Sequence, residues 1–222
     1  TCQFISSRAD VAPTEYIAVL SRLQDSVPAR PYSQVVAVIR GEFGKHPDEL
    51  FDGFTRAPIA SASLAQVHRA RTKDGHDVAV KVQYPGIDRI LETDLRNIAI
   101  LVKILARIEK NFDFRIMMRE LNKDMPRELD FELEGRSSER VAKDLAHRHD
   151  IRIPKVHWAE TRRRVLTTEL IEATKISDIE ALLAEGIDPN QVALITTQAY
   201  REENDQINEF IIKEKNHLEA SP

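Results

Sequence analysis

One lysine of this 222-residue chain lies in a sequence context that could place it in a binding or catalytic site. Lys81 lies in the run Val78-Ala79-Val80-Lys81-Val82. Because side chains alternate across a strand, the three valines share one face, and Ala79 and Lys81 share the other. Lys81 is therefore either a solvated residue at a sheet edge or a cation that faces a ligand. The run by itself leaves both interpretations open.

Carboxylates gather later, in the run Glu128-Leu129-Asp130-Phe131-Glu132-Leu133-Glu134. On a helix, Asp130 and Glu134 would share a face because they are four residues apart, whereas Glu128 would point well away from Glu134. Taken alone, a cluster of this kind usually forms a solvated acidic face without a role in binding.

The histidine and cysteine residues predict no metal site. The run His147-Arg148-His149-Asp150 looks superficially like a kinase catalytic loop, but Lys155 stands where that loop needs asparagine. Its histidines lack a third partner at metal-ligand spacing. The single cysteine, Cys2, excludes a disulfide scaffold and fits a reducing compartment.

Composition limits the classes of function. The formal net charge of −4 gives no electrostatic case for nucleic acid. No apolar run approaches the roughly 20 residues that cross a bilayer. The 42% hydrophobic content is enough for one domain or slightly more. The chain starts at Thr1 instead of Met, so the sequence says nothing about an upstream targeting peptide.

Two helices are predicted ahead of the lysine strand. Apolar residues at three-four spacing indicate the first, within residues 13–27. The second should run from about Ser33, taken as its N-cap, through Ile39 and stop near Gly41 and Gly44. A short connector is expected at 46–54.

The lysine strand belongs to a predicted hairpin across residues 59–82, with its turn at Lys73-Asp74-Gly75. The elements expected after it are two helices at 98–108 and 116–133, the second entered or kinked at Pro126, two strands at 156–159 and 164–171, and a final helix from about Pro189 through Tyr200. This order is that of a protein-kinase small lobe, but many α+β domains share it.

Five runs resemble, in order and spacing, the UbiB/aarF (ABC1-type) family of atypical kinases. They are an alanine-rich loop at 58–68, the lysine strand at 78–86, an E-x-D element with its following glutamate at 128–136, the last small-lobe strands and hinge at 153–158 and 165–171, and an amino-terminal extension starting at 3–10. Within the family, 134–136 and 153–158 look most like a mitochondrial subgroup concerned with lipid and membrane homeostasis.

The resemblance implies an α+β fold, namely a kinase-like small lobe of antiparallel sheet plus helices, with an N-terminal helical extension and a truncated large lobe. The implied domains are the extension at 1–53, the small lobe with a helical insert at 54–175, the start of the large lobe at 176–200, and a divergent tail at 201–222.

The same resemblance assigns a nucleotide site. Phosphoryl transfer needs a fixed cation over the phosphates, which would be Lys81, held by Glu134. Alanine does not readily reach positive φ, so the loop should hold phosphates through the hydroxyls of Ser61 and Ser63. The nucleotide-binding set is Ala60, Ser61, Ala62, Ser63, Val67 as roof over the base, Ala79 against the adenine, Lys81, Thr168 as gate, and Glu169 and Leu170 as hinge.

The extension and the missing motifs bear on activity. In the family the extension folds over the site, so Glu128 and Asp130 would face it near Gln3. The family's H-x-D-x-H-P-G-N loop and aspartate-phenylalanine-glycine motif, which supply the base and the Mg²⁺ ligands, do not occur in this chain. Its K-x-G-Q motif is represented only by Thr1-Cys2-Gln3.

The function implied by the resemblance is ATP binding with hydrolysis or small-molecule phosphorylation. It would serve isoprenoid-lipid (coenzyme Q) metabolism or mitochondrial membrane lipid homeostasis, at a mitochondrial or alternatively a plastid membrane. Lipid-biosynthesis proteins and membrane lipid are the expected partners besides the nucleotide. The alternative is a non-catalytic pseudokinase fragment that binds a partner or lipid, which the missing motifs favour for this chain.

Overall fold

The computed structural model describes residues 28–108, 122–123 and 125–219. The chain divides into two compact units. The first, here the sheet unit, holds Thr1–Gly135 and Val156–Leu170. The second, here the helical unit, holds Arg136–Lys155 and Ile171–Pro222. The predicted first helix and Gln3 lie outside the described residues.

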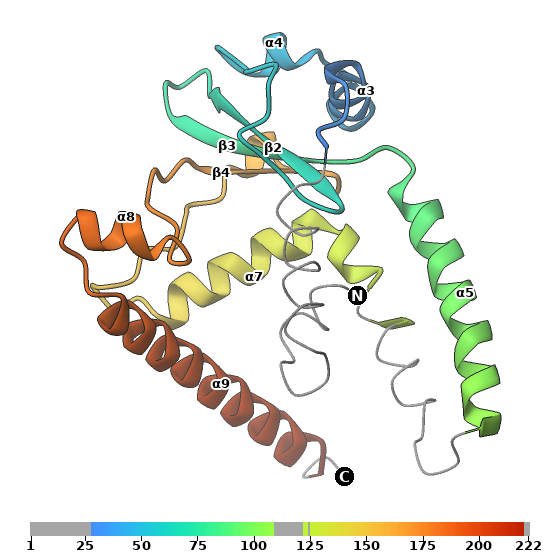
Figure 1. Ribbon diagram of the computed structural model, residues 1–222, viewed down its shortest axis with the longest axis vertical. Helices are drawn as coiled ribbons and strands as arrows, with labels where there is room; N and C mark the ends of the chain where they lie inside the picture. Colours follow the sequence, from blue (N-terminus) through green and yellow to red (C-terminus); the bar gives the residue numbers. More distant parts are fainter. Residues whose placement is uncertain (1–27, 109–121, 124, 220–222) are drawn as a thin grey trace. The chain divides into compact units, whose positions relative to one another are not determined.

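The sheet unit is built on four antiparallel strands in the order β1-β2-β3-β4 (Figure 1). They are β1 (Ala60–Ser61), β2 (Ala65–Arg71), β3 (Asp77–Gln83) and β4 (Val165–Glu169). The predicted turn of the β2–β3 hairpin is present, and Gly75 takes a φ of 87° there. Left-handed backbone of this kind favours glycine. The predicted α+β class is therefore confirmed.

The helices described are α3 (Tyr32–Phe43), α4 (Pro47–Leu50), α5 (Ile87–Ile108), α7 (Phe131–Asp144), α8 (Ile179–Ala184) and α9 (Pro189–Glu219), with 3-10 turns η1 (Arg127–Leu129) and η2 (Trp158–Glu160). Gly44 ends α3 with a φ of 69°, as its sequence position predicted.

Several expectations for these elements were wrong. The helix predicted at 116–133 is interrupted, since η1 and Asp130 precede the start of α7 at Phe131, and the final helix continues past Tyr200 to Glu219. Ser33 lies inside the first turn of α3, because the helix begins directly after Pro31, whose fixed φ suits a helix start. Residues 156–159 form no strand: Val156 makes one isolated bridge to Thr168, and η2 then turns the chain back. The connector at 46–54 contains α4, started by a capping box between His46 and Glu49.

The strand pattern separates two faces of the sheet. Val78, Val80 and Val82 are buried on the face that α3 covers, above the sheet in Figure 1. The core on this face consists of Val35, Val38, Ile39, Phe51, Phe54, Ala70, Val78, Val80, Val82 and Val165. Alternation then leaves Ala79 and Lys81 for the opposite face, as the sequence predicted.

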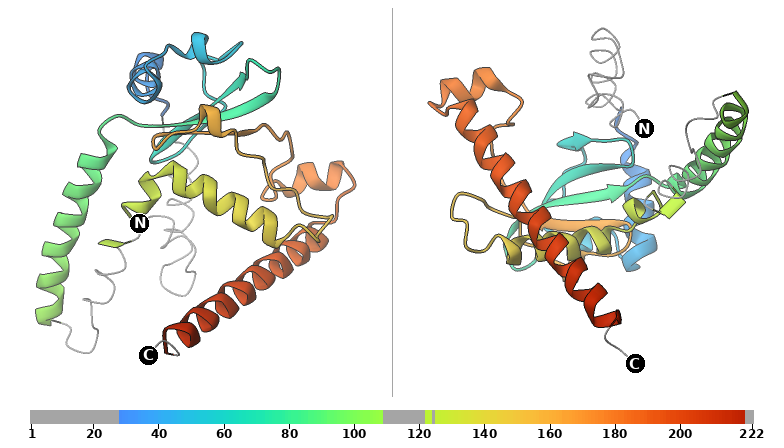
Figure 2. Two further views of the ribbon diagram at one scale, coloured as in Figure 1. Left: turned by 180° about the vertical axis from the view of Figure 1, so that it is seen from behind. Right: turned by 90° about the horizontal axis from the view of Figure 1, so that it is seen from below.

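The first turn of α7 packs on that opposite face, which the two views of Figure 2 show from behind and from below. Phe131 is buried there with Ala65, Val156 and Leu166, and Trp158 packs against the cluster. Gly135 lies about one turn after Phe131 in α7. A Cβ built on it would lie 3.0 Å from Trp158 Cη2 and 3.4 Å from Leu166 Cδ1. The helix can approach this closely because position 135 has no side chain.

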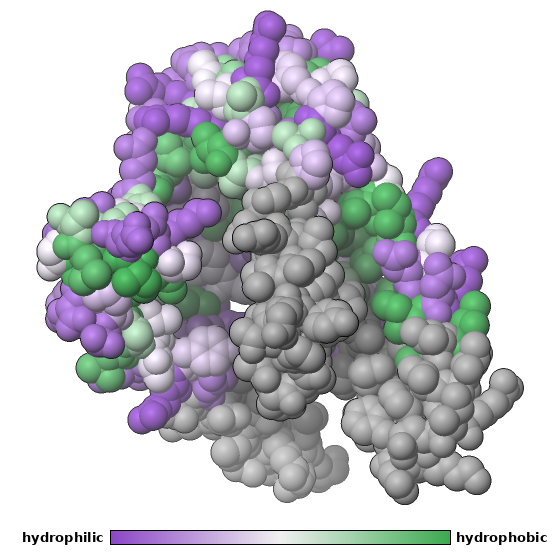
Figure 3. Space-filling model, viewed as in Figure 1, coloured by the Kyte–Doolittle hydropathy of each residue, from purple (hydrophilic) through white to green (hydrophobic). Residues whose placement is uncertain are grey.

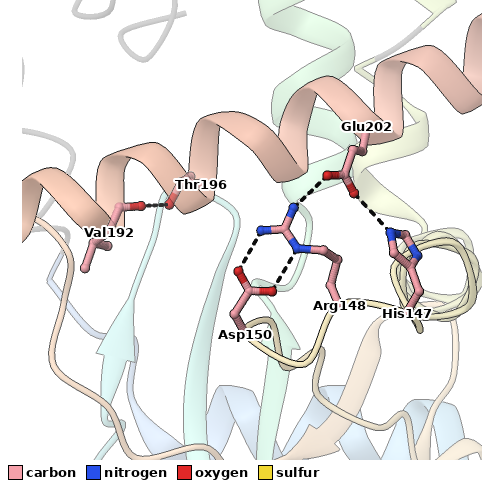
Figure 4. Close-up of polar contacts among 6 residues, drawn as sticks. All are labelled: His147, Arg148, Asp150, Val192, Thr196 and Glu202. Atoms are coloured by element: carbon pink, nitrogen blue, oxygen red, sulfur yellow. Dashed lines mark hydrogen bonds and ion pairs between the residues drawn. The ribbon is translucent and has the colours of Figure 1, made fainter.

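In the helical unit, Arg148 ties α9 to the chain that follows α7 (Figure 4). Its guanidinium donates to both carboxylate oxygens of Asp150, at 2.8 and 2.6 Å, and to Glu202 of α9 at 2.7 Å. His147 Nε2 lies 3.3 Å from the other Glu202 oxygen. The run that looked like a catalytic loop is therefore an anchor for α9.

The Arg148–Asp150 contact predicts an acid-sensitive anchor. Hydrogen bonding from Arg148 lowers the pKa of Asp150 from 3.8 to about 2. A depressed carboxyl pKa contributes stability that is present above the unfolded value and lost as pH falls through the folded value. We expect Asp150→Asn to destabilise the helical unit most above about pH 4, with the difference from wild type shrinking as pH falls through about 2 and vanishing below it.

Urea unfolding followed by circular dichroism across that pH range tests this expectation. Glu203→Gln is the matched control, because it removes a neighbouring α9 carboxylate that is outside the anchor. A pH-independent difference between wild type and Asp150→Asn would contradict the assignment.

The close approach at Gly135 generates a second prediction. Gly135→Ala adds a methyl group against Trp158 and Leu166, and overpacking of this kind costs about 1–3 kcal/mol. The gain in helix propensity, about 1 kcal/mol, offsets only part of that cost. We expect a lower free energy of unfolding in urea. Ser137→Ala, at an exposed position of the same helix, should not lower it, and a stabilising Gly135→Ala would contradict the packing argument.

Candidate functional site

Lys81 and Glu134 form an ion pair on the face of the sheet opposite α3. Lys81 Nζ lies 2.8 Å from both carboxylate oxygens of Glu134, so the contact is bidentate. The same nitrogen lies 4.5 Å from the centre of the Phe131 ring. The lysine side chain is 32% exposed, so water and a ligand can still reach it. The two residues that the sequence singled out as partners are thus brought together.

The start of α7 positions Glu134. Asp130 stands immediately before the helix, and its Oδ1 accepts hydrogen bonds from the amides of Glu132 and Leu133 at 3.1 and 3.3 Å. Asp130 therefore caps the N-terminus of α7. The expectation that Asp130 and Glu134 share a helix face does not hold. The reason is that α7 begins only at Phe131. Glu128 is exposed in η1.

A buried glutamine steadies the entry to this helix. Gln83, at the end of β3, is 4% exposed, and its Nε2 donates to the Leu129 carbonyl at 3.0 Å. Because Leu129 ends η1 just before the cap, the bond fixes the helix start to the lysine strand itself. Sequence reasoning gave Gln83 no role, although it lies two residues after Lys81 on the same strand face.

Small, half-buried side chains adjoin the lysine. In the sheet register Val67 is opposite Lys81, and Ala79 is opposite Thr168. Residues directly opposite each other in antiparallel strands share a face. Val67, Ala79 and Thr168 are each partly exposed. An apolar surface next to a cation suits the flat base and the phosphates of a nucleotide.

The alanine-rich loop closes without left-handed backbone. Ala60 is opposite Val67 and Ser61 is opposite Gln66, and the Ala62 amide donates to the Ala65 carbonyl at 2.8 Å. Among the described residues, only glycines take a positive φ, and none of these lies in the loop. The register places Ser61 on the face of Gln66, away from Lys81. Ala62 and Ser63 are exposed.

The hinge residues continue the edge strand. Glu169 is opposite Val78, and the Leu170 amide donates to the Asp77 carbonyl at 3.1 Å. Both side chains are half-buried. Glu169 and Leu170 thus follow Thr168 directly beside the small-residue surface, on the strand next to the lysine strand. Their role in reading an adenine remains a prediction.

No group of three or more His, Cys, Asp or Glu residues that could hold a metal ion occurs in residues 28–108, 122–123 and 125–219. In the same ranges no helix combines the length and apolar character that crossing a bilayer requires.

Comparison with known proteins identifies the relatives of this site. The model of the ABC1 atypical kinase-like domain matches residues 22–210. The chain is 36% identical over 200 residues to AarF domain-containing protein kinase 1 of Xenopus laevis, covering 90% of this chain and 38% of that protein. It is 33% identical to the protein ACTIVITY OF BC1 COMPLEX KINASE 8, chloroplastic, of Arabidopsis thaliana, covering 90% of this chain and 27% of that protein.

A solved structure agrees with the fold. The complex of Rv3197 with erythromycin from Mycobacterium tuberculosis matches with a TM-score of 0.59 and 33% identity, over 80% of this chain and 45% of that one. This chain thus spans less than half the length of each of these relatives. The family predicted from the five runs is confirmed, and the chain belongs to the ABC1 atypical kinase-like family.

Proposed function

We propose that this chain binds ATP, with Lys81 contacting the phosphates. The observation that carries the proposal is the Lys81–Glu134 pair at 2.8 Å beside the half-buried surface of Val67, Ala79 and Thr168. A carboxylate that contacts the lysine through both oxygens holds its ammonium at one place on the face of the sheet opposite α3. The family, whose name describes kinase-like domains, supports the assignment.

The predicted residues around the base would surround the nucleotide. The adenine would pack under Val67 as a roof and against Ala79 on the same face of the sheet, with Thr168 at the back of the pocket and the backbone at Glu169 and Leu170 along the edge of the base. The loop at 60–63 would cover the phosphates. Bound ATP would supply the transferable phosphoryl group.

The whole protein's role is a finer proposal. A loop of alanines wraps phosphates less closely than a loop of glycines, which favours slow ATP hydrolysis or small-molecule phosphorylation over protein phosphorylation. By resemblance, this activity would support isoprenoid-lipid (coenzyme Q) metabolism or mitochondrial membrane lipid homeostasis. We propose a mitochondrial location, with a plastid as the alternative, since the Arabidopsis relative is named as chloroplastic.

Removal of the lysine tests nucleotide binding directly. Lys81→Ala should weaken ATP binding, measured by calorimetry with and without magnesium, by about 10-fold or more, because hydrogen bonds to charged groups contribute roughly 1.5–3 kcal/mol. Lys73→Ala is the matched control. Lys73 lies in the turn of the same hairpin, is exposed, and also forms an ion pair, in its case with Asp52. Equal affinities of Lys81→Ala and wild type would reject the assignment.

The second candidate function is a partner- or lipid-binding module. The helical unit exposes large apolar side chains, which Figure 3 shows in green over α8 and the start of α9. The exposed residues are Ile176, Ile179, Leu183, Ile187, Leu194 and Tyr200. Contiguous apolar surface of this kind often marks an interaction site.

Flotation with phospholipid vesicles tests the lipid form of this candidate. Replacing Ile179 and Leu183 by glutamine should reduce the fraction of protein that floats, because these side chains are 48% and 60% exposed on α8. Glu180→Gln, on the same helix, serves as control. Flotation that is unchanged by the double substitution would argue against lipid binding through α8.

A further inference from the structure

Tyr84 carries a polar atom for which the fold offers no partner. The residue follows β3 directly, three positions after Lys81, and is 5% exposed. Its hydroxyl is buried and, among the described residues, has no hydrogen-bond partner. Leaving such a group unsatisfied is costly, and orphaned buried groups in native proteins call for a functional explanation.

The tyrosine is attached to the alanine-rich loop through its backbone. The Tyr84 amide donates to the Leu64 carbonyl at 2.9 Å, next to the turn that the Ala62–Ala65 hydrogen bond closes. Arg30 precedes α3 by two residues, and its guanidinium lies 5.4 Å from the centre of the Tyr84 ring. The ring is thus held in place, while its hydroxyl forms no hydrogen bond with a described residue.

Ser61 is the residue of the alanine-rich loop whose hydroxyl could bond to that of Tyr84. Burial raises the pKa of the Tyr84 phenol, and the Ser61 side chain and the charge of Arg30 both act to lower it. The sheet register agrees: Ser61 is opposite Gln66, and Gln66 is opposite Val82, so Ser61 shares the face of Gln66 and not that of Lys81. The Ser61 side chain is therefore on the face of the loop that is turned away from the proposed nucleotide.

We propose that Tyr84 is a positioning residue for the alanine-rich loop, and that its hydroxyl bonds to that of Ser61 when the loop closes on a nucleotide. The inference rests on the proposed function. A loop of glycines can wrap phosphates through its own backbone freedom, whereas this loop takes no positive φ. A side-chain latch from behind would hold it in the closed position instead. Closure would then also satisfy the buried hydroxyl.

Tyr84→Phe separates this role from a merely structural one. The substitution keeps the ring and the Arg30 contact and removes only the hydroxyl. In the absence of nucleotide, the melting temperature should stay the same or rise, because an unsatisfied buried group is lost. ATP affinity by calorimetry should fall about 3- to 10-fold, the size expected for one hydrogen bond. Tyr32→Phe is the matched control, because that ring also lies near a guanidinium, of Arg56 at 5.9 Å.

A double-mutant cycle identifies the partner of the hydroxyl. Ser61→Ala should weaken ATP binding as much as Tyr84→Phe does, and the double variant should be no weaker than either alone. Ser61→Thr keeps a hydroxyl and should restore most of the affinity. Additive losses in the double variant would overturn the pairing of these two residues.

The remaining outcomes separate the latch from the nucleotide site itself. A clear fall in melting temperature for nucleotide-free Tyr84→Phe would show that the hydroxyl already has a structural bond, and equal ATP affinity of Tyr84→Phe and wild type would show that closure does not use it. Either result overturns the latch and leaves the proposed function standing. A folded wild-type chain that binds no ATP overturns both.

Discussion

A carboxylate on a helix must reach a lysine on a central strand that lies 53 positions earlier in the chain. Lys81 and Glu134 meet only if α7 stands almost against the sheet at the correct height. Gly135 permits the short distance, Asp130 fixes where the helix starts, and Gln83 fastens the preceding turn to the lysine strand. Most of the packing on this face of the sheet can be understood as a means of holding that one pair.

The other face carries the stability that this arrangement requires. A partly exposed ion pair contributes only about 0–1 kcal/mol, so Lys81 and Glu134 cannot hold the helix in place by themselves. The fully buried valines of β3, packed against α3, supply the apolar burial instead. Alternation along this one strand therefore separates two roles. Its even-numbered valines build the core, and its odd-numbered residues Ala79 and Lys81 stay partly exposed on the other face.

Local patterns predicted the parts of this fold that local physics determines. Alternation placed Lys81 correctly, and the glycine turn located the β2–β3 hairpin. The sequence could not place the start of α7, because a helix boundary depends on which of several possible residues caps the helix. Asp130 was expected inside the helix, whereas it forms the cap. Residues 156–159 had a strand-like composition, yet η2 turns the chain back after a single bridge. The Lys81–Glu134 contact came from family resemblance, since no periodicity links positions so far apart.

Several residues beside Lys81 break the local rules that the rest of the sheet unit obeys. Gly135 weakens a helix interior, Gln83 buries an amide that needs its bond to Leu129, and Tyr84 buries a hydroxyl that has no partner among the described residues. The glycine and the unsatisfied hydroxyl lower the stability that the unliganded fold could have. Sequences that specify a fold well depart from these rules chiefly at functional sites. The departures gather within three residues of Lys81, at the end of β3 and just after it, and at the turn of α7 that faces the lysine. This clustering is what the proposed nucleotide site would explain.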